Sequence, residues 1–362
     1  MNSRRFSLFS SAWALALALG ALACSSSTTS DAGADGSVLP PDGGDGGTQP
    51  ACAPASPDYP SADFATNAAD ELALINQFKA FNQKMRDAAA SLSVTPTVEE
   101  LRALYAGPPS IKDATSSYYQ GVVDEALVAF AAAAGKAYTP AEPPPANGGL
   151  YDKWIFDPRG VDLRQLIEKG SFASLYYRRA AELAGGTVTP AVVDRILALY
   201  GSNPTFSGKD KEVPSPDVLG AVYASRRDAK DAANPGFYLR IKANLVAARA
   251  AAEKTECSGE AKAALDAVLT DWEKALGGTV IFYMKDAATK AAAPATAAAA
   301  LQGLGEAIGF VQGFRQLPAD IRIITDAQVD ELLALMEAPP SGTKAPYKLV
   351  TDAATVIPKL EQ

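Results

Sequence analysis

Apolar residues at helical spacing recur along almost the whole chain from about residue 66 onward. In residues 66–92, Leu72, Ile75, Phe78 and Phe81 follow one another at steps of three and four, which places them on one face of a helix. The same pattern and its capping signals predict further helices over residues 97–106, 115–134, 162–170, 171–185, 190–200, 216–231, 236–255, 259–291, 295–317 and 326–337. Alternating strand patterns are nearly absent, so the sequence predicts an all-α fold, a multi-helix bundle.

Capping residues mark several helix ends. Thr97 with Glu100, and Asp162 with Gln165, have the spacing of N-terminal caps, in which a side chain accepts from a free backbone N–H. Gly170 is predicted to end the helix that Asp162 begins. These capping residues predict the helix boundaries independently of the apolar spacing.

A Pro- and Gly-rich stretch, 140–149, is the best internal boundary. The run 150–160 (LYDKWIFDPRG) that follows predicts one short hairpin or extended segment, because Pro-Arg-Gly is turn chemistry. The helical domain, 61–362, therefore has two candidate halves, 61–149 and 150–362.

A weak internal repeat supports the idea of duplication. Residues 189–200 (TPAVVDRILALY) and 325–336 (TDAQVDELLALM) align without gaps, and Thr95-Pro96 begins a shorter third copy. Two duplicated helical halves remain one interpretation, and reuse of the same capping pattern is the other.

Three glycines recur every four residues at Gly305, Gly309 and Gly313. Because residues four apart share a helix face, this stripe predicts a close approach by another helix. Glu306 lies beside the stripe. It is a candidate ligand-binding residue if it faces inward, and otherwise it is a structural acid or a solubilising surface charge.

The composition excludes several functions. The chain has 33 Lys and Arg, 41 Asp and Glu and no histidine, so its net charge is −8. Without histidine there is no Ser-His-Asp triad, no Cys-His dyad and no histidine-ligated zinc. We predict no catalytic residue, no metal site and no resident cofactor from the residues, and an acidic chain is a poor partner for nucleic acid.

The amino terminus reads as an export signal. Arg4 and Arg5 precede an apolar run that ends in small residues before Cys24, so 1–23 is predicted to be a lipoprotein signal peptide. Cys24 is the predicted lipidation site. The segment 24–60 is rich in Ser, Gly, Pro and Asp, which is typical of a flexible linker.

The predicted location is the cell envelope. A lipid anchor at Cys24 would hold the protein to a membrane, and Ser25 after the cysteine favours the outer membrane, on its periplasmic or surface face. With Cys24 committed to lipid, Cys52 and Cys257 permit one disulfide in this oxidising compartment, the alternative being two free thiols.

Two adjacent cations are further candidates for a ligand site. Arg178 and Arg179 follow two tyrosines on a predicted helix. Such a pair can clamp a ligand carboxylate, although surface ion pairs explain it equally well.

Part of the chain resembles the imelysin-like helical envelope lipoproteins. The resemblance rests on DLRQLIEKGSFASLYY (162–177), WEKA (272–275) with Phe282-Tyr283, and LGEAIGF (304–310), and it covers residues 160–340. It implies an all-helical fold of duplicated bundles and a role in iron or haem acquisition. That family's Gly-x-His-x-x-Glu element has no counterpart in this chain, which has no histidine.

Three classes of function are consistent with these patterns. The first is a membrane-anchored, non-catalytic binding or scaffold module with an unknown protein or small-molecule ligand, with nutrient acquisition implied by the resemblance. The second is a carboxylate-based hydrolase, and the third is a structural partner-binding protein. A cleft with two facing carboxylates would favour the second class.

Overall fold

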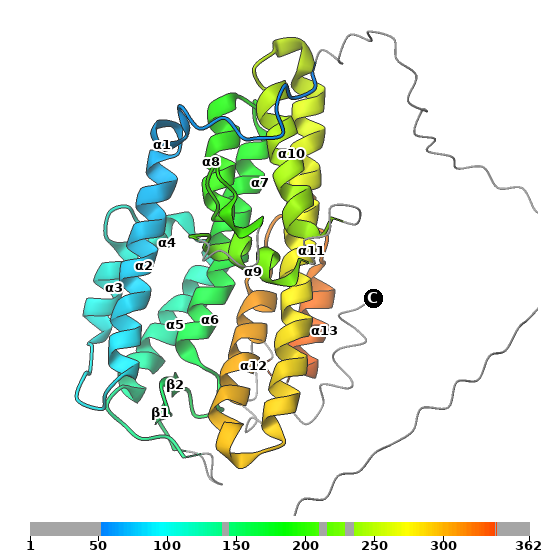
Figure 1. The fold of residues 1–362 in the computed structure, drawn as a ribbon. Coiled ribbons are helices and arrows are strands. Elements are labelled where there is room, and N and C mark those ends of the chain that lie inside the picture. Colours follow the sequence, from blue (N-terminus) through cyan, green and yellow to red (C-terminus); the bar gives the residue numbers. More distant parts are fainter. Residues whose placement is uncertain (1–51, 140–144, 210–215, 229–234, 337, 339–362) are drawn as a thin grey trace, which may run out of the picture. The chain divides into compact units, whose positions relative to one another are not determined.

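The predicted helices are present in the structure, and the fold is all-α. The computed structural model describes residues 52–139, 145–209, 216–228, 235–336 and 338. The longer helices are α2 (Ala69–Ala89), α3 (Val98–Ala106), α5 (Ser117–Ala133), α6 (Leu163–Ser171), α7 (Arg178–Gly185), α8 (Pro190–Tyr200), α9 (Leu219–Arg227), α10 (Phe237–Ala251), α11 (Ser258–Ala291), α12 (Ala297–Gln312) and α13 (Asp326–Leu335). Two one-turn helices, α1 (Phe64–Asn67) and α4 (Ile111–Ala114), complete the set labelled in Figure 1.

The predicted hairpin is present, but its turn is at Asp152-Lys153 and not at the Pro-Arg-Gly sequence from which it was predicted. Strands β1 (Gly149–Tyr151) and β2 (Trp154–Phe156) pair antiparallel, with Leu150 opposite Ile155. The tight turn between them places Asp152 at a φ of 58°. Aspartate tolerates this left-handed conformation better than most residues, so the turn needs no glycine.

The predicted caps are also confirmed. Glu100 and Thr97 form a reciprocal capping box at the start of α3, and the Asp162 carboxylate accepts from the Gln165 N–H at 3.0 Å at the start of α6. Thr189 caps α8 by accepting from the backbone of Val192. These bonds satisfy backbone donors that a helix leaves free at its first turn.

The predicted helix end at Gly170 is wrong. The helix runs on through Ser171, takes six residues of π-helix (Phe172–Tyr177) and continues as α7. Gly170 is needed for packing instead, because a Cβ there would lie 1.7 Å from the Tyr119 hydroxyl oxygen. A glycine therefore marks a close contact here, where the sequence indicated a cap.

The glycine stripe on α12 packs against α6, as predicted. A Cβ at Gly305 would lie 3.0 Å from the Cβ of Asp162, and one at Gly313 would lie 2.3 Å from the carbonyl oxygen of Gly170. Figure 1 shows α12 beside both α6 and α11. The buried helix α12 thus lies against α6 on one side and α11 on the other.

One apolar core joins both candidate halves. The largest buried cluster contains residues from Tyr59 to Ala338, and Trp272 of α11 is fully buried within it. The rings of Tyr177 and Tyr200 meet the Trp272 ring edge to face, with centroids 5.7 and 5.2 Å away. The two repeat-like segments, residues 189–200 and 325–336, both form a Thr-capped helix, and their duplication stays a prediction.

Candidate functional site

A groove of about 650 Å³ lies between α2, the π-helical segment and α9. Its floor is apolar and partly aromatic, and its rim is cationic. Side chains that belong to the floor are Ile75, Phe78, Phe172, Leu219, Val222 and Tyr223. The groove has the size and the mixture of apolar and polar lining typical of small-molecule sites.

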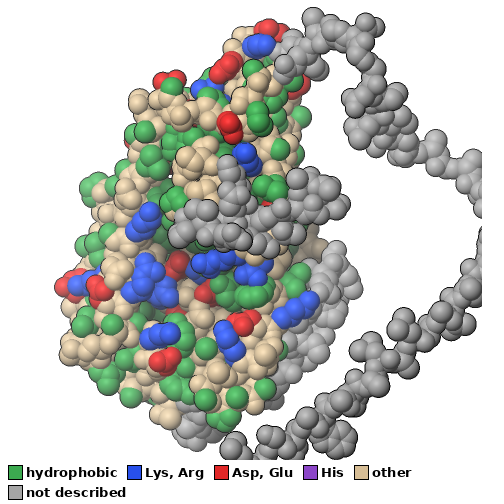
Figure 2. Space-filling view, viewed as in Figure 1, with side chains coloured by type: hydrophobic (Ala, Val, Ile, Leu, Met, Phe, Trp, Pro, Cys, Tyr) green, Lys and Arg blue, Asp and Glu red, His purple; other side chains and the backbone are tan. Residues whose placement is uncertain are grey.

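Three cations on the rim have no carboxylate partner in the part of the chain that the structure describes. Lys79 and Arg86 come from exposed positions of α2, and Arg226 comes from the last turn of α9. None of them has a carboxylate oxygen within 4.0 Å among the described residues. Figure 2 shows Lys and Arg side chains gathered across the middle of this face.

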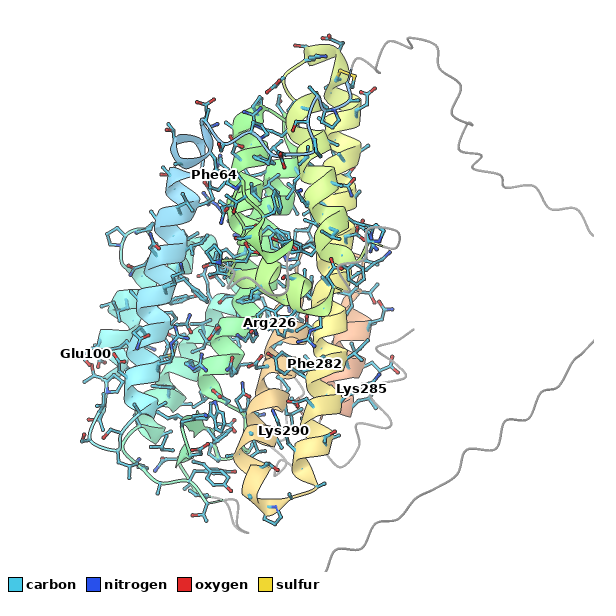
Figure 3. The ribbon with its side chains drawn as sticks, in the orientation of Figure 1. Phe64, Glu100, Arg226, Phe282, Lys285 and Lys290 are labelled. Atoms are coloured by element: carbon cyan, nitrogen blue, oxygen red, sulfur yellow. A yellow bond between two sulfur atoms is a disulfide. The ribbon has the colours of Figure 1, made fainter. Side chains whose placement is uncertain are left out.

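The pairing of the other arginines makes this arrangement unusual. Within the described ranges, each arginine other than Arg86, Arg226 and Arg227 has a carboxylate within 4.0 Å. Arg227 packs on the ring of Phe282, with its guanidinium carbon 3.5 Å from the ring centroid. Figure 3 labels Arg226 on α9 and Phe282 on the neighbouring helix α11. The unpaired arginines therefore concentrate at and beside the groove.

Beneath the rim lies a buried ion cluster. Lys169 is 3% exposed, and its Nζ lies 2.7 Å from Oε1 of Glu168, while Arg164 bonds the other carboxylate oxygen. The Lys169 Nζ also lies 5.3 Å from the ring centroid of Phe172 and 5.1 Å from that of Tyr223. The cluster ties α6 to the groove floor.

The cluster keeps its groups charged. Burial alone would raise the pKa of Glu168, but Lys169 and Arg164 hold that pKa below its usual value. Burial alone would lower the pKa of Lys169, but the charge of Glu168 holds it above its usual value. With Arg86 also close enough to act on Glu168, the positive charge around this carboxylate exceeds its own.

Glu306 faces inward, so the interpretation of this residue as a solubilising surface charge is wrong. It is 5% exposed, and one oxygen accepts from Gln302 while the other has no partner among the described residues. Burial, the neighbouring Tyr223 and the charge of Glu306 raise the pKa of Tyr283 well above its usual value. Glu306 therefore lies behind the groove and does not line it.

Asp162 is a second buried acid near Glu306. It is fully buried, and burial raises its pKa to about 6, with the charge of Glu306 adding to the effect. Asp162 and Glu306 each keep one unpartnered oxygen, but neither lines the groove. Both acids are buried away from the groove, so the groove does not present a pair of facing carboxylates.

Arg178 and Arg179 contact different partners and do not form a clamp. Arg178 bonds Glu182 and donates at 2.6 Å to the carbonyl oxygen of Ala114. Arg179 shares the buried carboxylate of Glu71 with Arg195, whose Nη2 lies 2.8 Å from Oε1 of Glu71. Both candidates thus have their donors engaged in fixing helices to one another.

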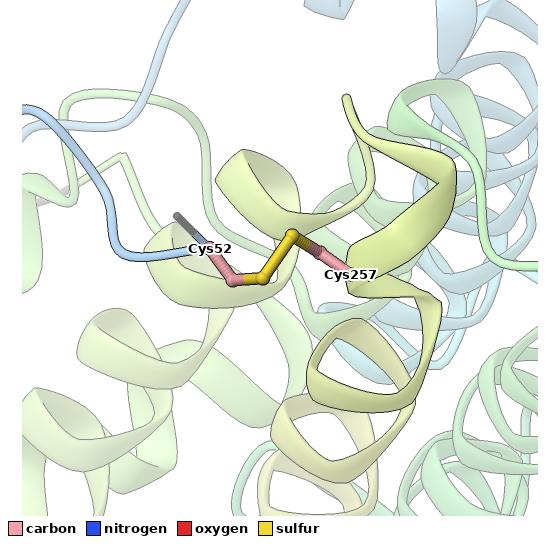
Figure 4. Close-up of a disulfide and its surroundings, with 2 residues drawn as sticks. All are labelled: Cys52 and Cys257. Atoms are coloured by element: carbon pink, nitrogen blue, oxygen red, sulfur yellow. A yellow bond between two sulfur atoms is a disulfide. The ribbon is translucent and has the colours of Figure 1, made fainter. Parts of the chain in front are cut away.

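Cys52 and Cys257 form a disulfide with their Cα atoms 5.6 Å apart (Figure 4). A second contact holds the same amino-terminal segment, because the Tyr59 hydroxyl donates to Asp194 at 2.7 Å and Arg249 also bonds that carboxylate. Cys24, the predicted lipidation site, lies outside the described residues.

The remaining buried acids have structural partners. Glu273 accepts from the Tyr177 hydroxyl and from the backbone N–H groups of Ile323 and Ile324. Across the described ranges, no group of three or more Cys, Asp and Glu side chains is arranged to hold a metal ion. In the same part of the chain, no helix has both the length and the apolar character needed to span a membrane.

Sequence reasoning missed the groove because its residues are far apart in the chain. One signal was present: Lys169 stands at the apolar spacing of its helix, three residues after Leu166 and three before Phe172. A charge in such a position indicates a buried ion pair.

The chain matches no protein-family model, no curated protein and no solved structure.

Proposed function

We propose that this protein is a lipid-anchored envelope protein that binds an organic anion in the groove between α2 and α9. The observation that carries the proposal is a set of three cations around an apolar floor, Lys79, Arg86 and Arg226, none of which has a carboxylate partner among the described residues. A ligand carboxylate or phosphate would supply the partner that these cations lack. The apolar part of the ligand would cover Phe78 and Phe172.

The charge distribution supports this choice. The whole chain carries a net charge of −8, so a cationic rim runs against the average of the molecule. Rims of one sign attract ligands of the other and raise their local concentration. The Arg guanidinium is the side chain best suited to bind a carboxylate or phosphate with two parallel hydrogen bonds.

The partial resemblance to imelysin-like lipoproteins agrees with a binding role in the envelope. Iron or haem acquisition, which that resemblance implies, is compatible with the proposal in one respect. Haem carries two carboxylates on an apolar ring, and the groove pairs cations with aromatic side chains. In this view the protein delivers or retains a ligand and catalyses nothing.

The test is a calorimetric titration of the full mature chain, in detergent, with 3-phenylpropanoate, which measures the affinity for this anion. The double variant Arg86→Gln/Arg226→Gln should bind this anion about 10-fold or more weakly, because a charged hydrogen bond contributes about 1.5–3 kcal/mol. The uncharged amide, 3-phenylpropanamide, should bind the unaltered protein more weakly than 3-phenylpropanoate does, by a similar factor.

The matched control is Arg102→Gln, which removes an exposed arginine that pairs with Asp124 and does not line the groove. The affinity of this variant for 3-phenylpropanoate should equal that of the unaltered protein. Equal affinities of the double variant and the control would overturn the proposal.

A further inference from the structure

Asn82 is a buried polar residue in the wall of the groove. It lies on α2 between the rim cations Lys79 and Arg86, and it is 2% exposed. Its Nδ2 donates to the carbonyl oxygen of Phe78 at 3.1 Å, so the amide orientation is set by that bond. Its Oδ1 accepts from no donor among the described residues.

An unpartnered buried acceptor is a costly feature. Removing a carbonyl oxygen from water without a hydrogen bond is unfavourable, and native proteins contain few such atoms. The bond to Phe78 accounts for the amide nitrogen alone. Because the oxygen belongs to a side chain that lines the groove, a bound ligand can supply the missing donor.

The other acceptors of the groove already have donors. Glu168 accepts from Lys169 at one oxygen and from Arg164 at the other. Asp217 accepts from Ser202 at 2.9 Å and from Tyr238 at 2.7 Å. Asn82 is therefore the groove residue, within the described part of the chain, with a buried acceptor left for a ligand.

We infer that the ligand is an organic anion with a hydroxyl or N–H donor close to its charged group, and that Asn82 selects it by accepting that hydrogen bond. The inference rests on the proposed anion-binding function. The charged group meets the rim cations, the donor meets Oδ1 of Asn82, and the apolar part lies on the floor. Hydroxy acids and N-acylated amino acids have this combination of groups.

The experiment compares two probes that differ by one hydroxyl. The full mature chain in detergent is titrated with 3-phenyllactate and with 3-phenylpropanoate, which share the carboxylate and the ring. We expect 3-phenyllactate to bind about 5- to 10-fold more tightly than 3-phenylpropanoate, because its hydroxyl adds one neutral hydrogen bond to the complex. This comparison needs no variant, so it does not depend on the folding of one.

A substitution then assigns the discrimination to Asn82. The variant Asn82→Leu, which keeps the branched shape but has no acceptor, should bind both probes with equal affinity. Asn76→Leu is the control, because Asn76 is an exposed asparagine of the same helix and does not line the groove. It should keep the preference for 3-phenyllactate.

The outcomes separate the two proposals. Equal binding of both probes to the unaltered protein would overturn the donor requirement and leave anion binding intact. A preference that survives in Asn82→Leu would overturn the role of Asn82. Binding of neither probe, or binding that ignores Arg86 and Arg226, would overturn the proposed function and the inference with it.

Discussion

Gly309 of α12 and Gln165 of α6 approach so closely that a Cβ on the glycine would lie 2.8 Å from the glutamine carbonyl oxygen. The same Cβ would lie 3.0 Å from the Cβ of Lys169. The contacting atoms belong to helix backbone and to a side-chain root, so neither can rotate away. The distance between α6 and α12 is therefore set by the absence of a side chain at this glycine.

The variant Gly309→Leu should lower the free energy of unfolding by about 3 kcal/mol or more, because the added atoms force two packed helices apart. The melting temperature should fall by about 10 °C, as measured by circular dichroism. Gly278→Ala is the control: a Cβ there meets nothing within 4 Å, and alanine favours the helix. Similar melting curves for Gly309→Leu and the unaltered protein would contradict the close contact.

Asp162 should make the protein less stable as the pH rises. The pKa of this buried carboxyl is raised from 3.8 to about 6 in the folded state, so its favourable contribution is complete below pH 3.8 and is lost as the pH passes through 6. Asp162→Asn keeps an N-cap acceptor without a charge. Between pH 4 and pH 7 the variant should gain about 2–3 kcal/mol relative to the unaltered protein in urea titrations. A pH-independent difference would contradict the raised pKa.

Glu71 has the opposite dependence on pH. Burial alone would raise the pKa of this carboxyl, but the hydrogen bonds from Arg195 and Arg179 lower it on balance. Its contribution to stability is therefore present above the unfolded pKa and is lost as the pH falls through the folded one.

Glu71→Gln should cost about 2–3 kcal/mol at neutral pH, less than a fully buried pair, because both arginines are about 30% exposed. Glu182→Gln removes the half-exposed partner of Arg178 and should cost less than about 1 kcal/mol. Chemical denaturation of both variants is the measurement. A smaller cost for Glu71→Gln than for Glu182→Gln would count against the buried pair.

The disulfide should stabilise the fold substantially. Cys52 and Cys257 are 205 residues apart in sequence, and closing so long a loop restricts the unfolded chain. The variant Cys52→Ser/Cys257→Ser should lose about 2–5 kcal/mol. Urea titrations with and without a reductant provide the check: the reductant should lower the stability of the unaltered protein and leave the double variant unchanged.

The lipid anchor has a direct test. Cys24→Ala should move the protein from the membrane fraction to the supernatant after cell disruption, because the proposed acyl chains attach to this cysteine. Mass spectrometry of the purified protein should show the acyl modification on Cys24 and no residues before it. Retention of Cys24→Ala in the membrane fraction would contradict the anchor.

Local signals predicted much of the fold. The helix caps depend on hydrogen bonds between residues three apart, so they can be predicted from local sequence. The examples are Thr97 with Glu100 and Asp162 with Gln165. The stripe that includes Gly309 predicted a close contact for the same reason, since the period of four is a property of one helix. Gly170 was misread because its role depends on Tyr119, which is distant in sequence.

The site could not be predicted in the same way. Lys79 and Arg226 are ordinary surface charges in sequence. That neither has a carboxylate partner among the described residues becomes visible when α2 and α9 are brought together. The candidates Arg178 and Arg179 failed as a clamp because the sequence does not show that Glu71 and Ala114 occupy their donors. The identity of a residue predicted its charge, and the fold determined its neighbours.

The disulfide also determines where a force applied to the amino-terminal segment enters the folded domain. Any tension applied before Cys52 passes through its sulfur to Cys257, the residue immediately before the 34-residue helix α11. The segment that carries Tyr59 is thereby bypassed, and its hydrogen bond to Asp194 is relieved of the strain. A pull on the amino-terminal segment would therefore enter the folded domain at the start of α11.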